Sequence, residues 1–205
     1  MNKQKKGFLI SLSGFDGVGK STQVKLLSDY LRSKDNKVKT TEEMFGYFLL
    51  KPLIKVLRKT SGSLPGGPVK RNSKALPKLW FILAFADIWF SFIFKITLMK
   101  KKYNFVVADR FYTDIWANLL YYGYLPKWAF NIFLQFLPKP DIAFMLVVEP
   151  AVVLRREKEF PPAYYKEQAR IYKNLSNQLN LYTIDASQAP QAVFADIKEK
   201  TKDLL

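Results

Sequence analysis

The stretch that most constrains this chain is residues 14 to 21, which read Gly-Phe-Asp-Gly-Val-Gly-Lys-Ser. They match G-x-x-x-x-G-K-[ST], a pattern in which glycines let the backbone turn tightly so that its N–H groups point at phosphate oxygens. The apolar run 7–13 before it is typical of a buried strand, and the apolar residues within 24–31 recur at helical spacing. A strand, a glycine-rich turn and a helix N-terminus are the context that this motif requires. We therefore expect the chain to bind a nucleoside triphosphate.

The loop predicts which residues hold the nucleotide. Lys20 is expected to reach the β- and γ-phosphates as a catalytic cation, and the Ser21 hydroxyl is expected to bind Mg²⁺. The predicted cofactors are therefore ATP and Mg²⁺. The nucleotide-binding residues expected in the loop and the first helical turn are Gly14, Asp16, Gly17, Val18, Gly19, Lys20, Ser21 and Thr22.

Composition narrows the chemistry that this site can use. The 205 residues include no histidine and no cysteine, which excludes imidazole catalysis, disulfides and thiolate metal sites. Phosphoryl transfer needs none of these, because it depends on positioning and on cations. The length suits one α/β core, so we expect residues 1–205 to form one P-loop kinase domain.

The formal net charge of +16 indicates anionic partners. Charge alone leaves nucleic acid, a membrane surface and phosphorylated small molecules open. Because the basic residues are spread along the chain, we expect no dedicated nucleic-acid groove. The lysine-rich start leads directly into the phosphate loop rather than to a cleavage site, which favours a cytoplasmic protein.

Short apolar runs alternate with helical patterns along the chain. This alternation predicts an α/β fold with a doubly wound, parallel, five-stranded sheet flanked by helices. Glycine and proline in residues 61–68 predict a mobile active-site loop at about 59–78. The strands are expected at 7–13, 37–41, 103–109, 142–148 and 181–185. The helices are expected at 20–33, 45–57 and 79–98, from about 113, and at 127–137, 149–154, 164–179 and 193–204.

Residues 79–98 are the most apolar stretch of the chain. Their number approaches the roughly 20 residues that a membrane-spanning helix needs. Asp87 at the middle argues against a span, because a carboxylate in lipid is costly. We expect a helix that is buried or that forms a homodimer, and membrane contact is the alternative.

A second candidate site follows the strand at 103–109. Ligands of open parallel sheets bind beyond the carboxyl ends of the strands, which is where Asp109 and Arg110 are expected. The Asp109 carboxylate would hold Mg²⁺ directly or through water. The Arg110 guanidinium would bridge donor and acceptor phosphates.

These motifs together resemble the thymidylate kinase family of nucleoside monophosphate kinases. In order and spacing the resemblance covers nearly the whole chain. It implies a P-loop kinase that transfers the ATP γ-phosphoryl group to a nucleoside monophosphate, by default dTMP to dTDP. The stretches similar to the family's loop, Asp-Arg-Tyr motif, Pro-Asp strand and last strand are 14–23, 107–111, 140–150 and 184–186.

The resemblance also implies roles for single residues. Asp16 would face the sugar hydroxyl of the acceptor, and Arg110 would hold the acceptor phosphate. The family places a catalytic cation either inside the phosphate loop or in a lid. Because Gly17 occupies the loop position here, a lid at about residues 155–162 is implied. Its catalytic cations would be Arg155 and Arg156.

The chain departs from the family at the acceptor phosphate. After its second strand the family carries Arg-Glu-Pro-Gly-Gly, whose arginine grips that phosphate. Residues 41–44 of this chain read Thr-Glu-Glu-Met. Lys70, Arg71 or Lys74 would have to replace the missing arginine.

A second departure concerns the base. The family's central helix stacks a phenylalanine on the base and reads it with an arginine four residues later. Ala84 and Ile88 stand at those places, and Phe85 could stack only if the helix were rotated. We therefore expect weak discrimination in favour of thymine.

Two other functions stay open on the sequence. One is a kinase for another small acceptor, sugar- or lipid-linked, in view of the apolar middle of the chain. The other is a non-catalytic ATP-binding protein that docks to a membrane or a partner through residues 79–98.

Overall fold

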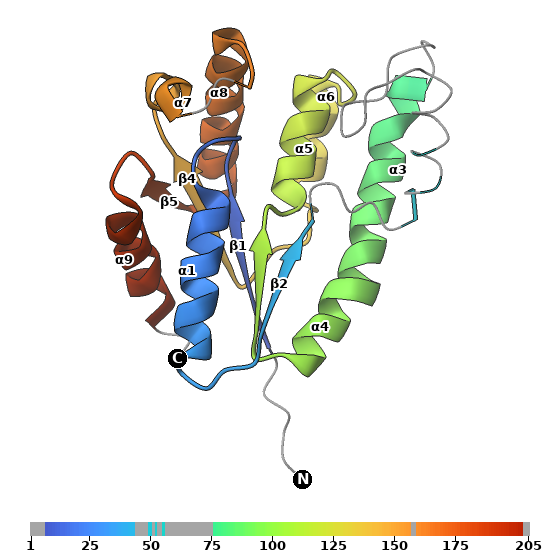
Figure 1. Ribbon diagram of the computed structural model, residues 1–205. Helices are drawn as coiled ribbons and strands as arrows, with labels where there is room; N and C mark the ends of the chain where they lie inside the picture. Colours follow the sequence, from blue (N-terminus) through green and yellow to red (C-terminus); the bar gives the residue numbers. More distant parts are fainter. Residues whose placement is uncertain are drawn as a thin grey trace.

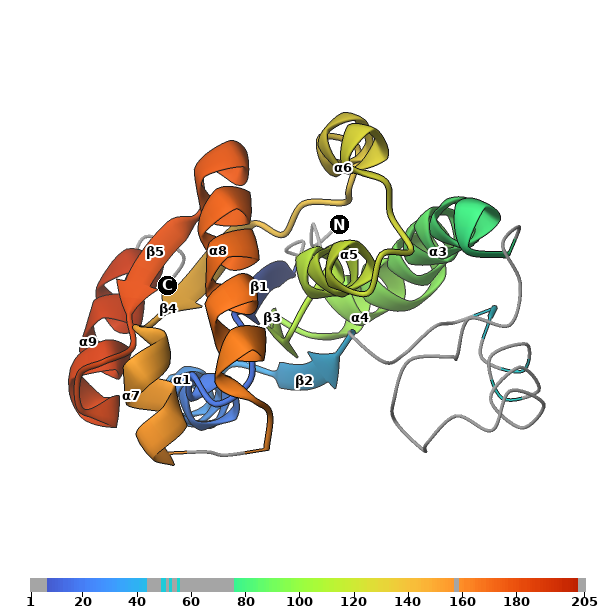
Figure 2. The same cartoon turned by 90° about the horizontal axis from the view of Figure 1, so that it is seen from above.

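A five-stranded parallel sheet forms the centre of the protein, with helices on both of its faces (Figures 1 and 2). The structure is a computed structural model, and it describes residues 7–43, 49–50, 52, 55, 76–156 and 159–202. The strand order is β2-β3-β1-β4-β5, which confirms the predicted fold class. The strands are β1 (Phe8–Ser13), β2 (Val38–Glu42), β3 (Phe105–Asp109), β4 (Ile142–Val147) and β5 (Tyr182–Asp185).

The three central strands carry the core. Strands β1, β3 and β4 are apolar along most of their length and largely buried, as expected for parallel strands covered on both faces. The edge strands β2 and β5 are mostly exposed and more polar. Strand β1 lies at the centre of the sheet, between β3 and β4. The loop that follows β1 therefore lies between the two halves of the sheet, at the point where such folds bind ligands.

Two groups of helices cover the faces of the sheet (Figure 2). Helices α1 and α9 lie on one face, and α8, α5 and the long helix α3–α4 lie on the other. The bounds are α1 Lys20–Arg32, α3 Leu76–Ser91, a π-helical turn Phe92–Ile96, α4 Thr97–Lys102, α5 Tyr112–Tyr121, α6 Lys127–Leu134, α7 Pro150–Arg156, α8 Pro162–Leu179 and α9 Pro190–Thr201.

The helix predicted at 79–98 is longer than expected and is not uniform. It runs without interruption from Leu76 to Lys102, through one π-helical turn. Its apolar character is broken by Asp87 and Ser91, which are both buried against the fold. The prediction of a buried helix is therefore correct for one side of it only.

Other boundaries shift by a few residues. Helix α6 ends at Leu134 rather than at 137, and α7 continues through Arg156 instead of ending at 154. Residues 76–78 of the predicted mobile loop form the start of α3, and the remainder of that loop lies outside the described residues. The helix predicted at 45–57 also lies outside them, apart from residues 49, 50, 52 and 55.

Candidate active site

The phosphate loop connects β1 to α1 in a conformation that requires glycine. Gly14, Gly17 and Gly19 have φ angles of 151°, 81° and 93°, which side chains of L-residues rarely allow. A Cβ atom on Gly14 would also lie 2.7 Å from the Leu146 carbonyl oxygen. The loop therefore passes close to β4 and delivers its backbone N–H groups to the N-terminus of α1, as the motif predicts.

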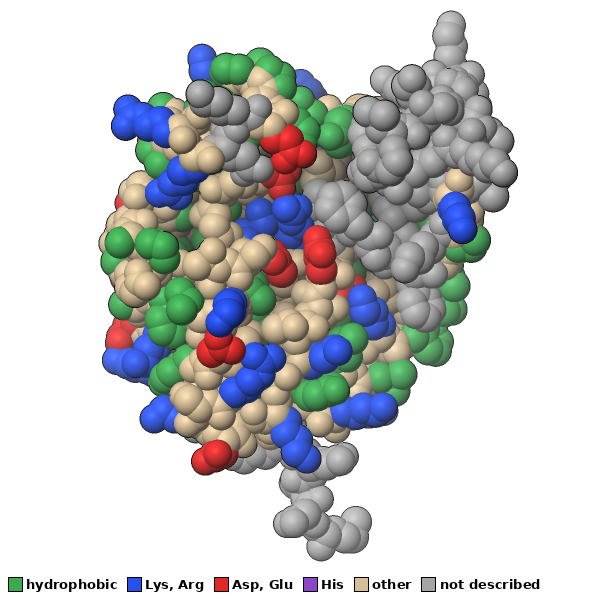
Figure 3. All heavy atoms as spheres, in the orientation of Figure 1, with side chains coloured by type: hydrophobic (Ala, Val, Ile, Leu, Met, Phe, Trp, Pro, Cys, Tyr) green, Lys and Arg blue, Asp and Glu red, His purple; other side chains and the backbone are tan. Residues whose placement is uncertain are grey.

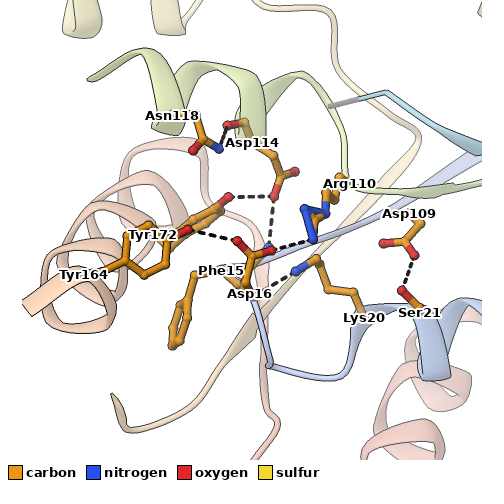
Figure 4. A network of polar contacts seen from close by, with 11 residues as sticks. Phe15, Asp16, Lys20, Ser21, Asp109, Arg110, Asp114, Asn118, Tyr164 and Tyr172 are labelled. Carbon is orange, nitrogen blue, oxygen red and sulfur yellow. Dashed lines mark hydrogen bonds and ion pairs between the residues drawn. The ribbon is translucent and has the colours of Figure 1, made fainter. Parts of the chain in front are cut away.

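Lys20 is the buried cation of this loop (Figure 4). Its Nζ atom donates a hydrogen bond to the Phe15 carbonyl oxygen at 2.8 Å. Burial lowers the pKa of Lys20, and the nearby Arg110 guanidinium lowers it further. A triphosphate in the loop would supply the anionic partner that this lysine needs.

Ser21 and Asp109 come together as the two predicted magnesium residues. The Ser21 hydroxyl donates to Oδ2 of Asp109 at 2.6 Å. The other carboxylate oxygen, Oδ1, is buried and has no hydrogen-bond partner among the described residues. A hydroxyl beside an unsatisfied carboxylate oxygen fits Mg²⁺, which is bound by few protein ligands together with water and phosphate oxygens. Within the described ranges, no three His, Cys, Asp or Glu side chains are grouped so that they could hold a metal ion alone.

Arg110 and Asp16 form an ion pair on the other side of Lys20 (Figure 4). The guanidinium Nη2 donates to Oδ1 of Asp16 at 2.5 Å. Arg110 has a φ of 66°, a conformation that costs free energy in a non-glycine residue and clusters at functional sites. Tyr164 of α8 donates its hydroxyl to the second Asp16 oxygen at 2.9 Å. Burial raises the pKa of Tyr164, and the Asp16 charge raises it further, so this hydroxyl remains a donor.

Asp114 is the residue that the sequence analysis missed. Its fully buried carboxylate accepts hydrogen bonds from the Ser13 hydroxyl, from the Gly14 and Phe111 backbone N–H groups, and from the Tyr172 hydroxyl, at 2.6 to 3.2 Å. It thereby joins the start of the phosphate loop to α5 and α8. The signal in the sequence was an aspartate in the first turn of the helix that follows Asp109 and Arg110.

The two predicted lid arginines lie at the end of a helix that follows β4. Arg155 and Arg156 belong to the last turn of α7, which corrects the expected helix end. The Arg156 guanidinium donates to the carbonyl oxygens of Ala186 and Ser187 at 3.2 and 3.3 Å. The structure thus brings Lys20, Ser21, Asp109 and Arg110 together, and it holds Arg156 on the turn that follows β5.

The positions at which the family reads the base are apolar here. Ala84 and Ile88 are buried in the core. The half-buried Phe85 packs with its ring against Phe133 and Trp116, at centroid distances of 5.0 and 6.0 Å. Lys70, Arg71 and Lys74 lie outside the described residues.

Charged side chains gather where these residues meet. Figure 3 shows basic and acidic side chains close together in the upper middle of the face, above α1, next to the carboxyl ends of the strands. This is the position at which doubly wound sheets bind nucleotides.

Comparison with known proteins decides the family. The sequence model of the family described as thymidylate kinase matches residues 12–197. The chain belongs to the thymidylate kinase family. The family's enzymes are nucleoside monophosphate kinases that use ATP and Mg²⁺.

Individual members of the thymidylate kinase family align along the whole chain. Thymidylate kinase of Rickettsia typhi is 26% identical over 98% of this chain and 87% of its own length. That of Prochlorococcus marinus is 29% identical over 95% of each chain. The crystal structure of thymidylate kinase from Ehrlichia chaffeensis superposes with a TM-score of 0.64 and 19% identity, over 96% of this chain and 99% of that one, which supports the fold.

Proposed function

We propose that this protein transfers the γ-phosphoryl group of ATP to a nucleoside monophosphate, with dTMP converted to dTDP as the default reaction. The observation that carries the proposal is the meeting of Lys20, the Ser21–Asp109 pair and the Arg110–Asp16 pair at one edge of the sheet. We further propose that residues 1–205 act as one domain in the cytoplasm.

Different residues would bind the two substrates, the phosphoryl donor ATP and the acceptor monophosphate. Lys20 and the loop N–H groups would hold the β- and γ-phosphates, and Ser21 with Asp109 would hold Mg²⁺, which when bound neutralises phosphate charge. Arg110, oriented by Asp16, would hold the acceptor phosphate. An oxygen of that phosphate attacks the γ-phosphorus while the bond to the β–γ bridging oxygen breaks, which leaves ADP. Arg155 and Arg156 would add charge from a lid at about 155–162.

Acceptor selectivity tests this proposal. Because Ala84 and Ile88 are buried and offer no polar edge to a base, thymine should be distinguished mainly by apolar contact. Apolar pockets discriminate by about 1–3 kcal/mol, so we expect kcat/KM for dTMP to exceed that for UMP and CMP by less than about a hundredfold. The measurement is ADP release with each monophosphate. Strong selectivity for dTMP would mean that a polar group elsewhere in the chain reads the base.

We also propose that a second copy of the chain covers the exposed apolar side of the long helix. The green side chains along the right flank in Figure 3 lie over α3 and α4. Trp89 donates its indole N–H to the Phe136 carbonyl oxygen at 3.1 Å, so this side continues beyond the end of α6. Monomers rarely expose an apolar patch of this kind. The apolar face, whose members are each at least 37% exposed, consists of Ile82, Leu83, Trp89, Phe90, Ile93, Phe94, Leu98, Trp128, Ile132 and Phe136.

A membrane is the competing occupant of this apolar face. In the described part of the chain, the helix Trp80–Lys102 is long and apolar enough to cross a bilayer, and 33% of its apolar window is buried. Spanning would pull the buried Asp87 and Ser91 away from the fold, so we favour the dimer.

Sedimentation distinguishes a second copy of the chain from a membrane as the partner of the apolar face. We expect a detergent-free dimer, and a monomer for Ile93→Glu, because a carboxylate in the middle of the buried interface would lose its hydration. Tyr182→Glu, at an exposed aromatic residue on β5, is the matched control and should remain dimeric. A monodisperse wild-type monomer, or sedimentation with vesicles alone, would reject the dimer.

A further inference from the structure

One side of the long helix carries a row of polar residues. The row consists of Asp87, Ser91 and Lys95, which are spaced four apart within the apolar stretch 79–98. The Lys95 Nζ atom donates to Oε1 of Glu43 at 2.7 Å, and the Ser91 hydroxyl donates to Oε2 of Glu43 at 3.3 Å. Asp87 accepts the backbone N–H groups of Leu49 and Leu50 at 2.5 and 3.1 Å. The row therefore faces the segment that follows β2.

A π-helical turn follows Ser91 in this row and contains Lys95. Residues Phe92–Ile96 are wound with the wider i→i+5 pattern, which reduces the rotation per residue. Such turns occur frequently at functional sites. Lys95, which pairs with Glu43, lies within this turn.

Glu43 lies beyond the same edge of the sheet as the phosphate-binding residues. It follows Glu42, which is the direct partner of Asp109 in the β2–β3 ladder. The long helix and α5 lie on the same face of the sheet (Figure 2). Burial raises the pKa of Tyr112, the first residue of α5, and the charges of Glu43 and Asp87 raise it further. The Phe92 ring, next to Ser91, also lies 6.4 Å from the Tyr112 ring, so the polar row lies beside the residue two positions after Arg110.

Lys95 and Arg110 are held in the same way. Each cation is fixed by one carboxylate, Glu43 for the lysine and Asp16 for the arginine. Their side chains are 26% and 19% exposed, whereas the Glu43 side chain is fully buried. A lysine ammonium has three N–H donors and the Glu43 bond uses one of them. Glu43 and Arg110 directly follow the paired residues Glu42 and Asp109 of the neighbouring strands β2 and β3. A dianion near this edge could therefore accept hydrogen bonds from both held cations.

We propose that Lys95 binds the phosphate group of the acceptor nucleoside monophosphate, with Glu43 as the residue that positions it. This inference rests on the proposed function. It places a cation from the long helix where the family uses an arginine after its second strand.

The test compares binding of dTMP with binding of thymidine by calorimetry, without ATP. We expect Lys95→Met to weaken dTMP binding by about tenfold to a hundredfold, the range for one hydrogen bond to a charged group. Thymidine binding should stay the same, because thymidine has no phosphate. Lys95→Arg should keep most of the dTMP affinity. Lys100→Met is the matched control. Lys100 lies on the same long helix and is also paired with a carboxylate, that of Asp141. It lies beyond the polar row, near the opposite edge of the sheet from the phosphate loop.

The double variant Glu43→Gln/Lys95→Met guards against misfolding. It removes both charges, so no buried carboxylate is left without its cation, and the loss specific to dTMP should persist. Equal losses for dTMP and thymidine, or no loss for dTMP, would overturn the role of Lys95 while leaving the kinase activity standing. A wild-type protein that binds neither compound would overturn the proposed function and this inference together.

Discussion

Lys20→Ala should reduce kcat/KM for phosphoryl transfer by on the order of a thousandfold or more. The lysine is the one cation buried within the phosphate loop among the described residues, and charge that develops on the transferred group would lose its nearest donor. The fold should be retained, because burial already disfavours the charged lysine, as its lowered pKa indicates. Steady-state ADP release and thermal unfolding measure the two effects.

Lys25→Ala is the control for this variant. Lys25 lies on the same helix, is exposed, and pairs with Asp29. Its removal should leave the rate unchanged. Turnover of Lys20→Ala close to that of the wild type would contradict a catalytic role for the phosphate loop.

Asp114→Ala should lower the free energy of unfolding by about 3–5 kcal/mol. The change leaves the Ser13 hydroxyl, the Gly14 and Phe111 N–H groups and the Tyr172 hydroxyl buried without their acceptor. Each unsatisfied buried group costs about 1–3 kcal/mol, and the costs are not additive. Urea unfolding measures the loss.

Two further variants separate hydrogen bonding from packing at this position. Asp114→Asn keeps the volume and one oxygen acceptor, so an intermediate loss is expected. Asp29→Ala removes an exposed carboxylate that bonds Lys25 and Arg32, and should cost less than about 1 kcal/mol. A loss for Asp114→Ala as small as that for Asp29→Ala would show that the carboxylate does not hold the loop in place.

The part of the site that could be predicted is encoded locally. A phosphate loop needs a buried strand, glycines with positive φ and a helix start, and residues 7–31 contain all three in sequence order. The placing of Asp109 and Arg110 followed from a general property of parallel sheets. For these residues short-range patterns were sufficient.

The part that could not be predicted depends on contacts between distant segments. Asp114 joins the phosphate loop to Tyr172, which lies 58 residues further along the chain. The Lys95–Glu43 pair joins residues that are 52 positions apart in the sequence, which periodicity analysis does not anticipate. Arg156 turned towards the carbonyl oxygens after β5, a direction that its basic neighbours in the sequence did not indicate.

The most direct test of the proposed function follows the transferred phosphoryl group itself. The purified protein is incubated with Mg²⁺, dTMP and ATP labelled in the γ-phosphate, and the products are separated by chromatography. We predict that the label appears in dTDP in an amount equal to the ADP formed, and that Lys20→Ala forms neither. Label that appears only as inorganic phosphate, or that stays in ATP with dTMP and every other nucleoside monophosphate offered, would contradict the assignment of this protein as a nucleoside monophosphate kinase.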